Sequence, residues 1–236
     1  MTDELFRSNP YKKTCNASVV SINDRGGIVL DRTVFYATSG GQPGDQGHLL
    51  IPDGREIEIA TTVYEKHSST IIHVPSQGAT LPKPGNKLRC SIDWEQRYAH
   101  MRTHTCLHLL CSIIGAPVTG GQISARRGRL DFDIPEATLD KDQLTAGLNQ
   151  LIEGDLAVFD RWITDEELAA QPNLVRTMMV KPPVGTGRVR LVEIKGCDLQ
   201  PCGGTHVART GEIGRATVTK IEKKGVQNRR VRIELD

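Results

Sequence analysis

The chain has 236 residues, of which 38% are hydrophobic and 25% are charged. This composition is typical of a folded protein with one large or two small domains, and it excludes wholesale disorder. Lys and Arg number 30 against 28 Asp and Glu, so the net charge of +2 neither requires nor excludes a nucleic-acid partner.

Two classes of protein are disfavoured at the outset. No apolar run approaches the roughly 18 residues of a membrane helix, and the first residues lack the apolar core of a secretory signal. We therefore expect a cytoplasmic protein with no membrane partner. Its six cysteines are then better interpreted as thiols or metal ligands than as a disulfide framework.

The first third of the sequence is typical of β-structure. β-Branched and aromatic residues concentrate in short runs at 28–37, 55–65 and 69–74, and turn clusters separate the runs. This pattern predicts a small barrel or sandwich over residues 1–90. The stretch 75–87 is rich in Pro and Gly, and its composition fits a domain linker and a long hairpin loop equally well.

From Asp93 the hydrophobic period changes to that of a helix, which Asp93 can cap and Gly115 and Pro117 can end. A second helix is expected from Thr138 to about Gly154, with Leu144, Leu148 and Leu151 on one stripe. A short helix over 165–173 and strands over 128–134, 189–194, 216–224 and 228–235 complete the pattern. These elements predict an α+β second domain over residues 91–236.

Four potential metal ligands stand in two pairs. His104 and His108 are four positions apart, so both imidazoles lie on one helix face. Cys202 and His206 are separated by two glycines and a threonine, which allow a tight turn. Each pair alone is weak, because a surface helix pair explains the histidines equally well.

Together the two pairs form a set of three nitrogens and one sulfur that suits one zinc ion per chain. A closed structural zinc is the alternative to a catalytic one. The ligands come from distant segments of a chain large enough to fold on its own core, which favours catalysis. Three protein ligands would leave a position for water or substrate, so one of the four would have to be exchangeable.

The neighbouring histidine and thiols have less specific interpretations. His100 lies one turn before His104 and is either a donor that supports a ligand, a spare ligand or a partly buried polar residue. Cys106 and Cys111 are expected to be small core residues. Cys197 is expected in a turn that follows a strand.

Longer motifs around these residues resemble a known family. Segments 99–110 (AHMRTHTCLHLL) and 200–207 (QPCGGTHV) resemble the editing domain of alanyl-tRNA synthetase and its free-standing relatives, the AlaX proteins. Segment 35–47 (FYATSGGQPGDQG) resembles the Gly-Gly motif of the family's N-terminal barrel, although Ala37 replaces a proline. Segments 118–121, 129–132 and 210–214 also fit in order. The threonyl-tRNA synthetase editing domain shares the ligand pattern, but the Gly-Gly motif points to the alanine family.

The resemblance implies an N-terminal β-barrel followed by a two-layer editing domain, with a long helix against an antiparallel sheet. It implies a medium-length AlaX protein, because nothing in the chain resembles an aminoacylation domain. Such a protein is an aminoacyl-tRNA deacylase that acts in trans on tRNA(Ala) carrying serine or glycine. The ester bond to the terminal ribose is hydrolysed with Zn²⁺ held by His104, His108, Cys202 and His206.

Other residues receive expected roles on this basis. Thr105, Gln122 and Asp198 are candidates for positioning water or the amino acid, and each has an alternative as a turn or capping residue. Substrate contacts are expected from Ser39, Gly40, Gly41, Thr119 and Ser124. Phosphate contacts are expected from the basic groups Arg126, Arg127, Arg129, Lys223, Lys224, Arg229 and Arg230, for which a solvated charged face is the alternative.

Two other functions fit the same residues. A zinc-stabilised RNA-binding module without catalysis would unfold on metal removal, and a zinc hydrolase of small esters would need no tRNA. The sequence leaves open whether the ion would activate water or hold the aminoacyl group. It also leaves the oligomeric state open.

Overall fold

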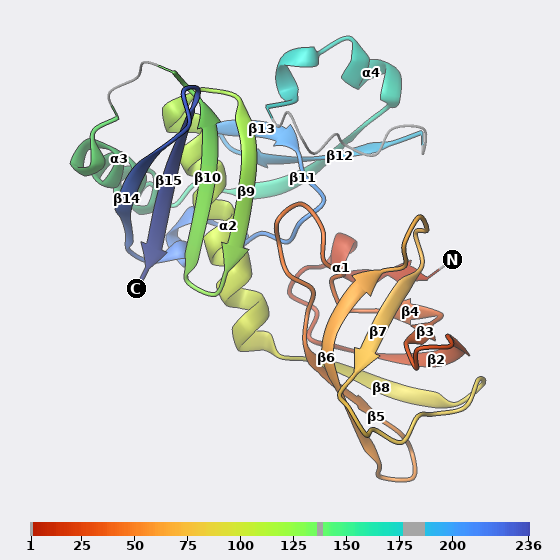
Figure 1. Cartoon of the computed structure of the whole chain (residues 1–236). Coiled ribbons are helices and arrows are strands. Elements are labelled where there is room, and N and C mark those ends of the chain that lie inside the picture. Colours follow the sequence, from red (N-terminus) through yellow and green to blue (C-terminus); the bar gives the residue numbers. More distant parts are fainter. Residues whose placement is uncertain (1, 136–138, 177–186) are drawn as a thin grey trace. The chain divides into compact units, whose positions relative to one another are not determined.

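A computed structural model describes residues 2–135, 139–176 and 187–236 (Figure 1). The chain divides into two compact units, Met1–Tyr98 and Ala99–Asp236. Strands dominate the first unit, and helices alternate with antiparallel sheets in the second. The predicted α+β class is therefore confirmed.

A closed, six-stranded antiparallel barrel forms the first unit, with strand order β2-β3-β7-β6-β5-β8. Alternate residues of the long strand β6 are buried, which is the pattern of a strand with one face toward a core. The core joins residues from most of the barrel strands, among them Val19, Leu30, Leu49, Ile59 and Leu88. The barrel strands are β2 (Thr14–Ile22), β3 (Ile28–Leu30), β5 (Gly47–Leu50), β6 (Glu56–Tyr64), β7 (Ile71–Pro75) and β8 (Lys87–Ile92).

Local details of this unit differ from the sequence predictions. The expected run 28–37 is divided between β3 and β4 (Arg32–Thr33), and β4 pairs in parallel with β1 (Asp3–Glu4) beside the short helix α1 (Leu5–Ser8). The stretch 75–87 is neither a domain linker nor a hairpin loop. It connects β7 to β8 within the barrel, and these strands pair with other neighbours instead of each other.

A buried ion pair fixes the turn region of the barrel unit. Arg97 is fully buried and its Nε donates to Asp45 Oδ1 at 3.0 Å, while its Nη2 donates to Val34 O at 2.7 Å. Asp45 also accepts from Tyr36 N at 2.7 Å through Oδ2. One buried guanidinium thereby holds both the backbone at Val34 and the side chain of Asp45. Loss of Arg97 would leave the Asp45 carboxylate without a compensating charge.

The long helix α2 (Trp94–Ile114) has the ends that the sequence predicts. Asp93 Oδ1 accepts from Gln96 N at 3.1 Å, which is an N-cap bond. At the other end Gly115 has φ of 68° and donates its N–H to Cys111 O at 2.9 Å.

A four-stranded antiparallel sheet with order β14-β15-β10-β9 packs on this helix. The contact is close at Gly128, where an added Cβ would lie 2.9 Å from Thr103 Cγ2. The predicted arrangement of a long helix against an antiparallel sheet is thus confirmed. The strands are β9 (Val118–Ser124), β10 (Arg127–Asp133), β14 (Ala216–Lys224) and β15 (Asn228–Leu235).

A second sheet of three strands, order β11-β12-β13, completes this unit (Figure 1). Its strands are β11 (Val158–Ile163), β12 (Val189–Ile194) and β13 (Asp198–Pro201), with α4 (Asp165–Ala169), η1 (Pro172–Leu174) and η2 (Thr210–Ile213) in the connections. Only β12 was expected. The short β13 ends at a proline, and β11 exposes most of its side chains, so neither shows the apolar pattern of a buried strand.

The second predicted helix is α3 (Lys141–Glu153), capped by Asp140, which accepts from Gln143 N at 2.8 Å. Thr138, its expected start, lies outside the described residues. Leu144 and Leu148 are buried as expected, but Ile152 occupies the third place on the stripe instead of Leu151. A residue four positions after Leu148 stays on the same face better than one three positions after it.

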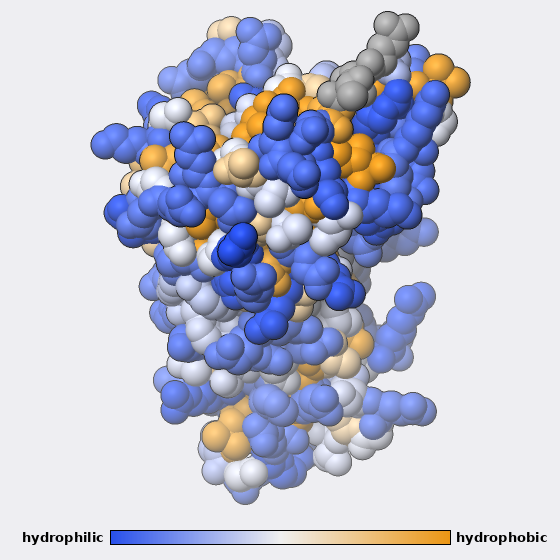
Figure 2. All heavy atoms as spheres, turned by 90° about the vertical axis from the view of Figure 1, so that its left-hand side faces the viewer, coloured by the Kyte–Doolittle hydropathy of each residue, from blue (hydrophilic) through white to orange (hydrophobic). Residues whose placement is uncertain are grey.

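Hydrophilic residues predominate on the face of the molecule drawn in Figure 2, and hydrophobic ones come to the surface mainly in its upper part. Among the described helices, none is long and apolar enough to cross a membrane.

Candidate metal centre

Helix α2 and the loop after β13 bring four candidate ligands together. The ligand atoms of His104, His108, Cys202 and His206 all lie within 4.8 Å of one another. The three imidazoles are buried. Cys202 Sγ lies 3.6 Å from His104 Nε2 and 3.3 Å from His206 Nε2. The grouping expected from the sequence is therefore present.

The two sulfur–nitrogen separations fit the geometry of tetrahedral zinc. Bonds of about 2.0 Å to nitrogen and 2.3 Å to sulfur place the two atoms roughly 3.5 Å apart. The two measured sulfur–nitrogen distances, 3.6 and 3.3 Å, lie on either side of this value. The donor set also suits zinc better than Mg²⁺ or Ca²⁺, which take oxygen ligands. The cluster could therefore hold a metal ion.

Arg190 of β12 holds the backbone of the Cys202 loop in place. Its Nη1 donates to the carbonyl oxygens of Cys202 and Gly204, each at 2.8 Å, and its Nη2 donates to Asp160 Oδ1 at 2.6 Å. Cys202 N in turn donates to Arg190 O at 3.1 Å. Both the backbone and the nearly buried side chain of Arg190 therefore fix the loop to the three-stranded sheet.

Two polar side chains orient the ligand imidazoles. His108 Nδ1 donates to Asp198 Oδ2 at 2.9 Å, and His206 Nδ1 lies 3.1 Å from Thr105 Oγ1. Bonds at Nδ1 leave the Nε2 atoms to face the cluster, which is the arrangement of a carboxylate–histidine–metal group. Asp198 and Thr105 thus each contact one of the candidate ligands.

The hydroxyl of Thr105 has no capacity left for a substrate. It donates to Met101 O at 2.9 Å and accepts from Val207 N at 3.3 Å. The N–H of His206 Nδ1 is a second donor to the Thr105 hydroxyl. The one proton and both lone pairs of this hydroxyl are then used. In this arrangement the Thr105 hydroxyl orients His206.

Burial and neighbouring charges shift the pKa values of three side chains in the cluster. Burial raises the pKa of the Cys202 thiol, but His104 and His206 overcome this and hold the pKa well below its usual value. Burial lowers the pKa of His108, whereas Asp198 and Cys202 raise it to a net value of about 9. Burial also lowers the pKa of His206 well below its ordinary value. A thiolate and neutral imidazoles are the forms that bind a metal, so the shifts of Cys202 and His206 favour binding, whereas His108 must release its proton.

Two residues near the cluster had no predicted role. Gln200 Nε2 donates to Asp198 Oδ2 at 2.8 Å, and Arg176 Nη1 lies 3.6 Å from Asp198 Oδ1. The alternation of β13 is a signal that could have identified Gln200, since Asp198 and Gln200 share one strand face. Arg176 carries no such signal, because it lies outside every regular element near the cluster.

The structure places Gln122, Ser124 and Thr119 on β9, the edge strand of the four-stranded sheet. Gln122 is exposed, and its Oε1 accepts from Arg129 Nε at 3.2 Å. Thr119 Oγ1 donates to Asn228 Oδ1 at 3.0 Å. These two hydrogen bonds lie within the four-stranded sheet and do not involve the four ligands.

The glycine-rich turn belongs to the barrel unit. Ser39 and Gln42 form an isolated antiparallel bridge, with Gly40 and Gly41 at φ of 55° and 83° between them. A two-residue turn with both φ values positive favours glycine at each position. This explains the Gly-Gly pair as a turn requirement.

Several of the basic residues expected to bind phosphate have acidic neighbours. Arg129 and Arg230 both pair with Asp131, at 2.9 Å and 2.7 Å. Arg127 pairs with Glu234 at 2.8 Å, and Lys224 lies 3.8 Å from Glu222. The positive charge of this sheet is therefore partly neutralised. Arg126, Lys223 and Arg229 complete the set, and Arg229 donates to Pro135 O.

The other histidine and thiols considered in the sequence lie on α2 or beside it. His100 is buried but is not a member of the four-ligand group. Cys106 and Cys111 are buried core residues, as expected, and burial raises the pKa of each thiol to about 12. Cys197 lies in the turn before β13, 3.0 Å from Ser112 Oγ.

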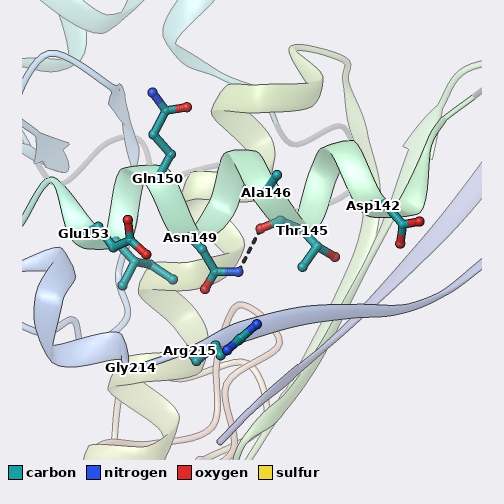
Figure 3. A pocket seen from close by; sticks show the side chains of 9 residues that line it. Asp142, Thr145, Ala146, Asn149, Gln150, Glu153, Gly214 and Arg215 are labelled. Carbon is teal, nitrogen blue, oxygen red and sulfur yellow. Dashed lines mark hydrogen bonds between the residues drawn. The ribbon is translucent and has the colours of Figure 1, made fainter.

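A surface pocket lies elsewhere in the second unit, beside α3 (Figure 3). Asn149 lines it and donates from Nδ2 to Thr145 O at 2.8 Å and to Ala216 O at 2.8 Å. None of the four described ligands lines this pocket.

Comparisons with known proteins agree with this arrangement. The family model described as threonyl and alanyl tRNA synthetase second additional domain matches residues 189–232, and tRNA synthetases class II (A) matches residues 8–96. The alanyl-tRNA editing protein AlaX-M of Methanosarcina acetivorans is 35% identical over 242 residues, covering 98% of this chain and 98% of its own. AlaX-M of Saccharolobus solfataricus is 34% identical over 238 residues, with the same shares. The alanine–tRNA ligase of Korarchaeum cryptofilum is 34% identical over 99% of this chain but only 26% of the ligase.

Proposed function

The chain belongs to the family of AlaX alanyl-tRNA editing proteins, and from that premise we propose that it hydrolyses seryl-tRNA(Ala), and more slowly glycyl-tRNA(Ala). It is an aminoacyl-tRNA deacylase that edits mischarged tRNA(Ala). Relatives that match from end to end are free-standing editing proteins, which supports action in trans in the cytoplasm. The observation that carries the proposal is the convergence of His104, His108, Cys202 and His206.

One Zn²⁺ is the cofactor that fits this set, and His104, His108, Cys202 and His206 would hold it. A bound zinc ion supplies Lewis-acid chemistry to ester hydrolysis. Asp198 holds His108 and Thr105 holds His206 at the correct ring orientation, while Arg190 holds the loop that carries Cys202. This chain's own contribution is therefore a preorganised set of donors.

Selectivity for serine follows from the chemistry of the two amino acids. Serine differs from alanine by one hydroxyl, which a hydrophobic synthetase pocket rejects poorly. An editing site that hydrogen-bonds this hydroxyl leaves a polar group unpaired when alanine is present. Ser39, Gly40, Gly41, Thr119 and Ser124 remain the proposed substrate contacts, and Gln122 the proposed residue that positions water.

Deacylation of three esters of the same tRNA tests the proposal. Seryl-tRNA(Ala) should lose its amino acid about ten- to a hundredfold faster than alanyl-tRNA(Ala) or glycyl-tRNA(Ala), because neither alanine nor glycine has the hydroxyl that makes the buried hydrogen bond. Equal rates on all three would refute the selectivity. Hydrolysis of a free serine ester at the same rate as the tRNA ester would favour a small-ester hydrolase.

Metal removal separates the proposal from a non-catalytic RNA-binding module. After dialysis against a chelator, deacylation should cease while far-UV circular dichroism stays near that of the holoprotein, because hydrophobic cores in both units supply the fold. Added Zn²⁺ should restore activity. Loss of secondary structure on chelation, with no deacylation before it, would favour the structural alternative.

A further inference from the structure

Three strands place an exposed aromatic residue in line with Cys202. Trp162 of β11 pairs with Arg190 of β12, and Arg190 O accepts from Cys202 N on the far side at 3.1 Å. Residues opposite one another in a sheet project from the same face. Trp162 and Arg190 therefore project from one face of the sheet, which also carries Asp198 and Gln200, and Cys202 directly follows β13 beside Arg190.

The distance from Trp162 to Cys202 suits a nucleotide. Adjacent strands lie about 4.8 Å apart, so two spacings separate Trp162 from Cys202 by roughly 10 Å at the backbone. This is comparable to the distance from a ribose hydroxyl to the far side of its attached base. A terminal nucleoside whose ester lies at the metal ligands can thus extend its base to Trp162.

Trp162 is firmly placed yet open to solvent. Its cross-strand partner Arg190 is buried and hydrogen-bonded to Asp160, Cys202 and Gly204, so the strand beside Trp162 is held in place. Trp162 itself is 51% exposed. Among the described residues, only Trp162 and Phe159 are exposed Phe or Trp side chains. Phe159 lies on the same strand but on the opposite face, because side chains alternate along a strand.

We propose that Trp162 is the stacking surface for the 3′-terminal base of the aminoacylated tRNA. The inference rests on the proposed function, since it concerns the nucleotide that carries the ester. An unpaired terminal base has both of its π-faces available, and stacking on an aromatic side chain needs no particular hydrogen-bond pattern. One such residue suffices to place the ribose, so the low aromatic content of 4% is no obstacle.

The kinetic test compares Trp162→Ala and Trp162→Phe with Phe159→Ala. Phe159→Ala is the matched control, since it removes an aromatic ring of similar exposure, 43%, from the opposite face of the same strand. For seryl-tRNA(Ala), Trp162→Ala should raise KM about tenfold or more with little change in kcat. Trp162→Phe should recover most of the loss, and Phe159→Ala should match the parent.

Fluorescence provides a readout that does not depend on activity. The chain has two tryptophans, and the other, Trp94, stacks on Tyr98 in the barrel unit. In a Trp94→Phe variant, uncharged tRNA(Ala) that ends in CCA should quench Trp162, whereas the same tRNA without its terminal adenosine should not. Equal quenching by both tRNAs, or none by either, would overturn the inference.

The outcomes separate this inference from the proposed function. If the parent fails to deacylate seryl-tRNA(Ala), the proposed function fails and the quenching experiment still decides whether Trp162 binds the terminal base. If the parent is active and Trp162→Ala behaves as Phe159→Ala does, only the role of Trp162 is refuted.

Discussion

At the scale of single residues, Thr105 links the fold of α2 to the candidate metal ligands. Its hydroxyl contacts Met101 O, Val207 N and His206 Nδ1, so it connects the helix, the loop and a ligand. A residue that acts by orienting a ligand should affect metal affinity before it affects the reaction. Asp198 has the same relation to His108.

Thr105→Val keeps the shape of the side chain and removes the hydroxyl. We expect zinc affinity to fall about 10- to 100-fold, the usual consequence of removing a residue that orients a metal-bound histidine. Competition with a fluorescent chelator measures this, and Thr105→Ser should stay close to the parent. If Thr105→Val bound zinc normally but had a much lower kcat, Thr105 would have to contact the reacting atoms instead.

His73 makes the barrel unit sensitive to acid. It is fully buried, its Nδ1 donates to Ile28 O at 3.0 Å, and its Nε2 lies 2.8 Å from Thr33 Oγ1. Burial lowers the pKa of His73 to about 4. Because the unfolded chain takes up a proton near pH 6.5 and the folded one does not, stability is fully present above pH 6.5 and is lost as pH falls toward 4.

The expected loss over this window is about 3 kcal/mol, at about 1.36 kcal/mol per pKa unit. Urea unfolding at about pH 7 and about pH 4.5 should show it as a fall in the free energy of unfolding. His73→Gln should weaken the pH dependence, because it cannot become charged. An identical dependence in parent and variant would mean that other groups cause it.

At the scale of secondary structure, the packing of α2 on β10 sets where the helix histidines lie. Gly128 allows this approach, since an added Cβ would lie 2.9 Å from Thr103 Cγ2 and 3.1 Å from Leu107. Gly120, on the neighbouring strand, has its nearest contact at an ordinary 3.4 Å from Asp131 Oδ2. The two glycines therefore form a matched pair for substitution.

Gly128→Ala should destabilise the protein by about 1–3 kcal/mol, because overpacking forces the helix and the strand apart. Gly120→Ala should be nearly neutral. Denaturant unfolding measures both, and zinc content shows whether the displaced helix still presents His104 and His108. A neutral Gly128→Ala would indicate that the helix shifts without cost.

At the scale of the whole molecule, a net charge of +2 must still allow a polyanion to bind. Asp131, Glu222 and Glu234 neutralise part of the basic face of the four-stranded sheet. Binding therefore depends on the few cations whose charge reaches phosphate. Among the expected contacts, Lys223 and Lys224 occupy the last two positions of β14, and both are exposed, with Lys224 Nζ at 3.8 Å from Glu222 Oε1.

Deacylation of seryl-tRNA(Ala) at limiting substrate should fall as salt rises, because phosphate contacts release counterions. In the double variant Lys223→Ala/Lys224→Ala, a plot of log tRNA affinity against log salt concentration should be less steep. The slope should fall by about 1 for each lysine that neutralises a phosphate in the parent. Arg127→Ala, which removes a cation paired with Glu234, should change the slope less. Filter binding over a range of salt concentrations measures these slopes, and a slope unchanged in the lysine variant would exclude both lysines.

The sequence by itself determined the elements whose signals are local. The hydrophobic period and Asp93 define α2 and its start, the need for a positive φ accounts for Gly115, and one helix face carries both His104 and His108. The motif around Cys202 is also local, because two glycines and a threonine bring its sulfur and the His206 imidazole to one side. Fold class and the ligand group could therefore be predicted.

Only the tertiary structure decided which distant side chains meet. Asp198 reaches His108, the Thr105 hydroxyl is saturated by partners that include Val207, and Trp162 aligns with Cys202 through Arg190. These relations depend on strand register and on how closely α2 approaches its sheet. Register is set by pairing between segments far apart in the chain, so no local pattern of residues encodes it.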